Sequence, residues 1–224
     1  MKNFLVLTII LMLGAYGRVV AQDAAAASKR ANQQYVLFES ERDKGTNVTG
    51  MYSYLLDSYE NFMKVVEAPD NGQYLSGAKN RLRAMYPYLL NGAVYYSEQK
   101  QPSKALDFAA AYIEMPRLKI FQSELLPKDN RYASVVYYAA VSAYNLQKYS
   151  QALKYFQEYL STGTDTQQKD CYVYMNMIYQ SQKNYSEQER VLEEAIAKYP
   201  VSLDFLYNLV NVYIATNDME KLLG

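Results

Sequence analysis

The sequence predicts an all-α fold made of helix–turn–helix pairs stacked one after another. Residues 132–160 hold two helical patterns in tandem, separated only by a short polar turn at 145–148, which indicates an antiparallel helix pair. The pair recurs, because Tyr149, Tyr185 and Met219 stand at the same place in successive pairs, 36 and 34 residues apart. No segment with the period of a strand stands out. Since one pair cannot bury its own apolar face, we expect neighbouring pairs to share a core.

The N-terminus, residues 1–21, predicts a secretory signal peptide. Lys2 gives a positive start, residues 4–13 are apolar except for Thr8, and the small residues before Ala21 suit cleavage after that position. The apolar run is too short to span a bilayer, and no later segment is long enough, so we expect no transmembrane segment after cleavage. The mature chain is expected to be exported and soluble, in the periplasm or associated with the cell envelope, with residues 22–28 as a flexible lead.

Residues 29–86 are predicted to form N-terminal helices that resemble the later repeats only weakly. Helical spacing indicates helices over 29–44, 51–66 and about 74–85, with breaks around Gly45 and at 68–72. Pro87 either kinks the third helix or starts a new one over 88–99, because proline is well tolerated in a first turn.

From residue 88 to residue 224 the pattern predicts repeats. Pro102 opens a helix that Pro116 closes, and the irregular stretch that follows is compatible with a short helix at 118–126. After the pair at 132–160 and a break at 163–165, helices are predicted over 168–182, 186–198 and 202–215. The last pair opens its second helix at residue 218, so we expect a truncated final repeat in a fragment of a longer protein; the alternative is a partner that covers this end.

A helical-pair repeat of about 34 residues resembles the tetratricopeptide repeat (TPR) family. The resemblance covers residues 88–224 and rests on small residues, aromatic residues and a closing proline at family positions: Ala93, Ala140, Ala105, Ala152, Ala195, Tyr96, Tyr179, Tyr213 and Pro200. Four positions depart from it by carrying larger side chains in place of the small ones: Asn176, Val210, Gln188 and Leu222. The resemblance implies a right-handed α-α superhelix, and the layout is similar to exported TPR proteins of Bacteroides-type Gram-negative bacteria.

The composition argues against an enzyme and predicts no cofactor and no metal. The chain has no histidine, one cysteine and no glycine-rich phosphate loop, so the usual nucleophile systems and a thiolate zinc site are missing. Glu193 and Glu194 are adjacent on a helix and point in different directions, as solvated charges do. Cys171 is interpreted as a small buried apolar residue. The net charge of +0 gives no general attraction to nucleic acid, so no nucleic-acid partner is expected.

The resemblance also implies that the first helix of each pair lines an inner, concave face. Carrying over the family's inner positions gives a candidate groove of twelve residues: Ser134, Tyr137, Val141, Tyr144, Asn145, Asp170, Val173, Met177, Gln180, Asp204, Tyr207 and Asn211. Because none is lysine or arginine, the terminal carboxylate that chaperone-binding members of the family grip is disfavoured. Tyrosine, asparagine and aspartate instead suit an extended peptide or a sugar. In a second interpretation, Tyr137 and Tyr144 only pack against neighbouring helices.

These observations lead to a hypothesis about function and an alternative. The hypothesis is a non-catalytic, extracytoplasmic helical-repeat scaffold that binds a protein or peptide through a tyrosine-rich concave face. The alternative is a glycan-binding accessory protein of an envelope uptake system, with tyrosines as stacking platforms. A hydrolase would require carboxylates from different helices to converge. The identity of the partner does not follow from the sequence.

Overall fold

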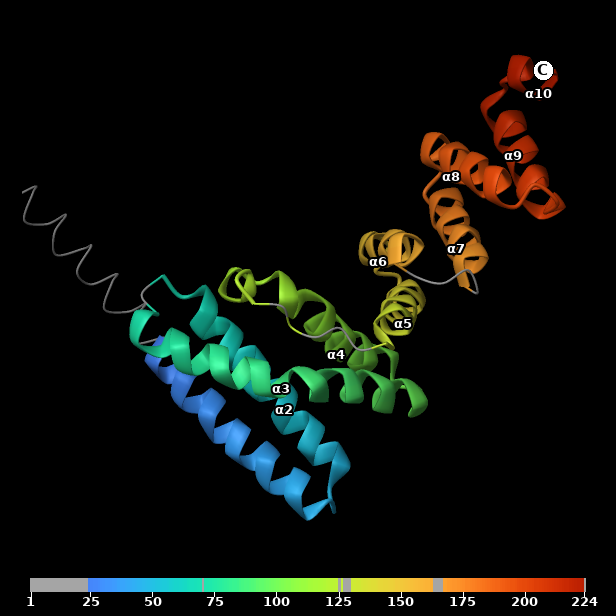
Figure 1. The fold of residues 1–224 in the computed structure, drawn as a ribbon. Helices are drawn as coiled ribbons and strands as arrows, with labels where there is room; N and C mark the ends of the chain where they lie inside the picture. The colour runs from blue at the N-terminus through green and yellow to red at the C-terminus, as the bar shows by residue number, and fades with distance from the viewer. Residues whose placement is uncertain (1–23, 70, 125, 127–129, 163–166, 224) are drawn as a thin grey trace, which may run out of the picture. The chain divides into compact units, whose positions relative to one another are not determined.

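A computed structural model describes residues 24–69, 71–124, 126, 130–162 and 167–223 (Figure 1). Within these ranges the structure is helical and contains no strand, which confirms the predicted all-α class. None of the described helices combines the length and apolarity that crossing a membrane requires. The predicted signal peptide and the predicted break at 163–165 lie outside the described residues. The chain divides into two compact units, residues 1–95 with 108–127 and residues 96–107 with 128–224.

The first unit begins with a helix over residues 24–44, followed by α2 (Val48–Glu67) and α3 (Gly72–Glu98). Then come α4 (Pro102–Glu114), of which residues 108–114 belong to this unit, and two short 3-10 helices, Met115–Arg117 and Lys119–Phe121. The first helix starts earlier than predicted, so residues 24–28 are helical and do not form the flexible lead assigned to 22–28. The reason is packing, since Ala24 and Ala27 are buried. The short helix predicted at 118–126 is present only as the turn at Lys119–Phe121.

Helix α3 continues through Pro87, so no new helix starts at residue 88, which was one of the two outcomes that the sequence left open. An interior proline costs about 3 kcal/mol, because it removes a backbone hydrogen bond and crowds the preceding turn. The side chains on both sides of Pro87 are buried: Met85, Tyr86, Leu89 and Leu90. Burying a large apolar side chain stabilises by about 1.5–3 kcal/mol, so four of them together outweigh the local cost. Tertiary packing therefore overrides the local rule at this position.

Aromatic rings and one glycine fix the packing of α2, α3 and α4 inside the first unit. The rings of Tyr86 and Tyr112 stack with centroids 4.5 Å apart, and Tyr52 meets Phe108 edge-on at 5.6 Å. A Cβ atom at Gly92 would lie only 2.5 Å from Cδ1 of Phe108. Any larger residue at Gly92 would displace the ring, so this crossing depends on glycine.

The second unit carries the helix pairs that the sequence spacing predicts. It contains α5 (Tyr132–Asn145) with α6 (Tyr149–Thr162), α7 (Gln168–Ser181) with α8 (Tyr185–Lys198), and α9 (Leu203–Thr216) with the short α10 (Met219–Leu223). The observed ends agree with the predicted ends to within two residues. Each helix from α5 to α9 has 14 residues and packs on the next along the chain. The prediction of stacked helix pairs is confirmed.

One turn, used four times, sets the register of the repeat. Four residues that are not glycine have a left-handed backbone with φ between 53° and 57°, each two positions before a second helix: Lys100, Gln147, Lys183 and Asn217. In every case the next N–H donates to a carbonyl five residues back, 2.9 Å away, and the four acceptor carbonyls belong to Tyr96, Ala143, Tyr179 and Tyr213. This is the Schellman ending of a helix. Pro102 therefore matches Tyr149, Tyr185 and Met219 as the first residue of a second helix.

Candidate functional site: the exposed face of the first helices

The candidate residues stand at matching positions of three successive first helices, α5, α7 and α9. Counted from the shared turn, eleven of the twelve form four rows that cross these helices, and Asn145 stands next to the last row at the end of α5. We call Ser134, Asp170 and Asp204 the polar row, and Tyr137, Val173 and Tyr207 the apolar row. The third row is Val141, Met177 and Asn211, and the fourth begins with Tyr144 and Gln180. Because successive rows are three or four residues apart, they lie on one side of each helix. We call this side the first-helix face.

Exposure differs along the first-helix face. On α7 all four residues are exposed, including Val173 at 38% and Met177 at 43%. On α9 the residues Asp204 and Asn211 are exposed, and Tyr207 is 70% exposed. On α5 the face is more covered, because Tyr137, Val141 and Tyr144 are half-buried. Only Ser134 and Asn145 of the candidate residues on this helix are exposed. The apolar side chains that reach solvent therefore belong mainly to α7 and α9.

Tyr137 connects α5 to α7. Its hydroxyl donates to Oδ2 of Asp170 at 3.3 Å, and its ring lies 5.4 Å from the ring of Tyr159 on α6. Burial, followed by the negative charge of Asp170, raises the pKa of the Tyr137 hydroxyl. The hydroxyl therefore keeps its proton over the physiological range and remains a hydrogen-bond donor.

Tyr144 is held in an aromatic cluster formed by α5, α6 and α7. Its ring lies 6.0 Å from Tyr149 and 4.9 Å from Tyr174, and Tyr174 stacks on Phe156 at 5.1 Å. Among the tyrosines that the structure describes, only Tyr138 and Tyr207 are more than about a third exposed. Tyr137 and Tyr144 thus contribute to packing between helices, as the second interpretation of the sequence proposed, and each keeps only part of its surface open.

Sequence reasoning missed two exposed residues on this face. Tyr138 is 55% exposed, and its ring lies 5.8 Å from that of Tyr137. It stands four residues after Ser134 and three before Val141, so helical spacing alone places it on the same side. Ile214 is 59% exposed and completes the fourth row, 34 residues after Gln180. Adding the repeat period of 34 residues to Gln180 would have identified Ile214 from the sequence.

The first helices carry almost no charge. Across α5, α7 and α9 the charged side chains are Lys169, Asp170 and Asp204. The ammonium of Lys169 lies 5.8 Å from the centre of the Phe205 ring, within the range of a cation–π contact. Both aspartates belong to the polar row and are exposed. The first-helix face is therefore an apolar and hydrogen-bonding surface with two carboxylates at one edge.

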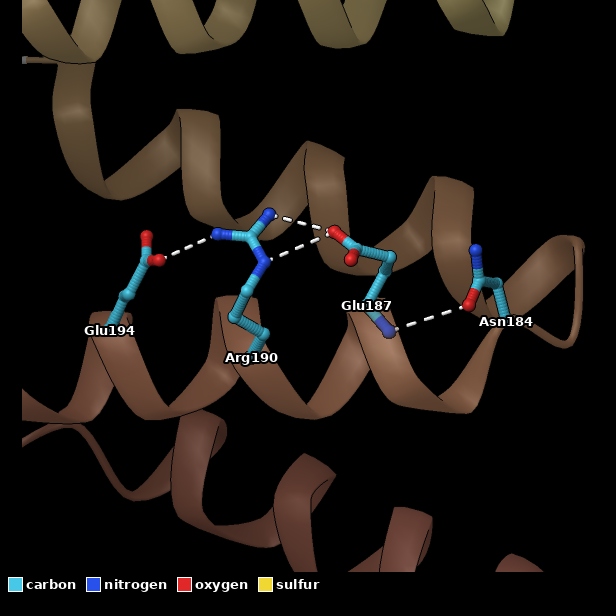
Figure 2. Close-up of polar contacts among 4 residues, drawn as sticks. All are labelled: Asn184, Glu187, Arg190 and Glu194. Carbon is cyan, nitrogen blue, oxygen red and sulfur yellow. Dashed lines mark hydrogen bonds and ion pairs between the residues drawn. The ribbon is translucent and has the colours of Figure 1, made fainter.

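Helix α8 shows the contrasting pattern of a second helix (Figure 2). Arg190 donates to Glu187 at 2.8 Å and to Glu194 at 2.6 Å, and the side chain of Asn184 accepts from the backbone N–H of Glu187. These partly exposed pairs, three or four residues apart, stabilise the helix by less than about 1 kcal/mol each. Glu194 is engaged within its own helix, as expected for a solvated helix charge.

The remaining chemistry of the described residues is sparse. They contain no group of three or more aspartate, glutamate, cysteine or histidine side chains that could hold a metal ion. Cys171 is fully buried, and burial raises the pKa of its thiol to about 12. A protonated, inaccessible thiol is a poor nucleophile, which agrees with its interpretation as a buried apolar residue.

A separate pocket of about 490 Å³ lies in the first unit, between the first helix and α2. Its polar lining consists of Arg30, Asn61, Lys64 and Glu67, beside several alanines. The lining thus combines two cations, a carboxylate and an amide. This mixture of charges does not define one class of ligand as clearly as the rows of the first-helix face do.

The fold and the shared turn define the class of this chain, an all-α helical-repeat protein with TPR-like hairpins. No family model and no curated protein matches the sequence. Among solved structures, a tetratricopeptide repeat protein from Parabacteroides merdae is similar at 16% identity and a TM-score of 0.37, covering 87% of this chain and 77% of that one. BtubC from P. vanneervenii is similar at 16% identity and a TM-score of 0.42, covering 91% and 86%.

Proposed function

We propose that this chain is a non-catalytic scaffold that binds a protein or peptide through the first-helix face. The observation that carries the proposal is the exposure of Val173, Met177 and Tyr207 on neighbouring first helices that are nearly free of charge. Exposed apolar side chains gathered on one surface usually mark a contact. The N-terminal pattern of residues 1–21 supports a place for this function outside the cytoplasm.

The glycan alternative has less support from the geometry. Stacking on a sugar needs a ring whose flat face is open. The rings of Tyr137 and Tyr144 are engaged with Tyr159 and Tyr174, which leaves Tyr138 and Tyr207 as the more open rings. We therefore favour a peptide or protein partner, whose apolar side chains also match Val173 and Met177.

The test is affinity capture from an envelope extract of the source organism, with the chain from residue 22 onward as bait. The face variant carries Val173→Ser, Met177→Ser and Tyr207→Ser. The matched control carries Val36→Ser, Leu37→Ser and Val48→Ser, which changes apolar residues that are also exposed but belong to the first unit. Circular dichroism checks that all three proteins are equally helical.

We expect the natural chain and the control to retain the same protein, identified by mass spectrometry, and the face variant to lose it. Binding should then be reproduced with the purified protein. A partner that all three baits retain equally would show that the first-helix face is not the binding surface. Retention of glycan instead of protein, lost on Tyr138→Ala and Tyr207→Ala, would favour the alternative.

A further inference from the structure

We propose that the first-helix face binds an extended peptide in which lysine or arginine recurs about every third residue, with apolar residues between. This inference rests on the proposed function and adds the chemistry of the partner. It is carried by the direction of the rows, their spacing, their charge and their apolar surface.

The rows cross the helices. The hydrogen bond from Tyr137 to Asp170 joins a residue of the apolar row on α5 to a residue of the polar row on α7. On the next step, Tyr172 and Lys169 of α7 contact the ring of Phe205 on α9, so these two helices are also neighbours. A ligand that uses equivalent positions in each repeat must therefore run across α5, α7 and α9.

The spacing of the helices sets the period of the ligand. Neighbouring first helices meet through side chains, Tyr137 with Asp170 and Tyr172 with Phe205, and we take as their spacing the distance of about 8–10 Å that is typical between packed helix axes. An extended chain advances about 3.3 Å per residue. One repeat therefore corresponds to about three residues of an extended peptide, and the three first helices together take about nine.

The negative charge of the polar row favours a ligand with positively charged side chains. Asp170 and Asp204 are exposed, and Ser134 offers a further hydroxyl acceptor. The one cation of these three helices, Lys169, lies against the Phe205 ring. A basic side chain of the ligand would meet a carboxylate at this row, whereas an acidic residue or a terminal carboxylate would meet the same sign of charge.

The apolar row explains why the basic residues are separated by apolar ones. Val173 and Tyr207 stand one turn along their helices from the aspartates of the polar row, and Met177 follows on α7. These side chains are exposed and can cover aliphatic side chains of the ligand, together with the aliphatic stems of its lysines or arginines.

The test selects a displayed library of random twelve-residue peptides on the chain from residue 22 onward, and enriched peptides are then synthesised for binding titrations. We expect lysine or arginine at three-residue intervals, and weaker binding at high salt. Asp170→Asn and Asp204→Asn should each weaken binding about three-fold, and together about ten-fold, the size usual for exposed charge pairs. Asp57→Asn with Glu60→Gln removes two exposed carboxylates of α2 and should leave the affinity unchanged.

The outcomes separate this inference from the proposed function. Enriched peptides that lack basic residues, or that bind the double asparagine variant as well as the natural chain, would overturn the inference. If those peptides were still lost on Val173→Ser with Met177→Ser, the proposed function would stand. If no enriched peptide depended on any first-helix residue, both would be overturned.

Discussion

The hairpins α5/α6 and α7/α8 have the same helix lengths, the same turn and the same register, but their helices meet over different side chains. In α5/α6 the two positions that the TPR pattern reserves for small residues are Ala140 and Ala152, both fully buried. In α7/α8 the equivalent residues are Asn176 and Gln188, which are 5% and 3% exposed. The amide of Gln188 donates to Oδ1 of Asn176 at 2.9 Å.

The difference shows that this position requires burial and mutual fit more than small size. Two of the four departures from the family pattern, Asn176 and Gln188, occur in this hairpin, and each amide is the partner of the other, so the two replacements have to be explained together. The solution is incomplete, because Oε1 of Gln188 is buried without a hydrogen-bond partner among the described residues. A buried unsatisfied polar atom costs about 1–3 kcal/mol. We therefore expect α7/α8 to open more readily than α5/α6.

The largest expected effect comes from placing half of the amide pair into the alanine hairpin. Ala140→Asn inserts a polar side chain where Ala152 offers no partner, which combines overpacking with an unsatisfied amide. Each of these costs about 1–3 kcal/mol, so we expect a loss of about 3 kcal/mol in the free energy of unfolding. Urea denaturation followed by circular dichroism measures it.

The control for this change is Ala197→Asn, at an exposed position of α8. It carries only the difference in helix propensity, about 0.5 kcal/mol. Hydrogen exchange measured on peptides from α5 and α6 would show whether the loss is local, because repeat proteins open in parts. Equal effects of the two substitutions would mean that the alanine crossing is not tightly packed.

The next effect comes from removing the amide pair one member at a time. Asn176→Ala leaves the Gln188 amide buried without its acceptor and should cost about 2 kcal/mol, and Gln188→Ala should cost about the same. The double variant restores the alanine pair of α5/α6 and should cost about 1 kcal/mol less than the sum of the single changes. Urea denaturation of the four proteins completes the cycle. Additive costs would contradict a direct coupling between the two amides.

Much of this fold could be predicted because the repeat makes local and tertiary signals agree. Five helices of the second unit were predicted with ends correct to within two residues. The prediction used the spacing of apolar residues, the breaks between helices and the repeat that relates Tyr149 to Met219. The failures occur where burial opposes a local rule. Pro87 allowed a new helix from residue 88, but the buried residues around it keep α3 continuous. Residues 24–28 were predicted as part of a flexible lead, but they are helical, and Ala24 and Ala27 are buried.

The candidate site could be predicted by position but not by exposure. Repeat spacing identified Val173, Met177 and Tyr207, which are exposed. The same spacing could not show that Tyr137 is bonded to Asp170, because that contact joins residues 33 positions apart on different helices. Nor could it choose between Tyr137 and Tyr138, which are adjacent in sequence but differ in how much of each ring reaches solvent. Such a choice depends on the neighbouring helix.

The smallest expected effect concerns what the two hairpins share. Gln147 and Lys183 occupy the left-handed turn with φ of 57° and 53°, a conformation that costs a residue with a Cβ atom about 1 kcal/mol and glycine much less. Because the turn is the same in both hairpins, Gln147→Gly and Lys183→Gly should each stabilise by about 0.5–1 kcal/mol, in spite of their different cores. Gln157→Gly, inside α6, should instead destabilise by about 1 kcal/mol. The midpoints of urea denaturation measure the stabilisation by each substitution. Unequal stabilisation by Gln147→Gly and Lys183→Gly would show that the amide pair of α7/α8 affects the turn of that hairpin as well as its core.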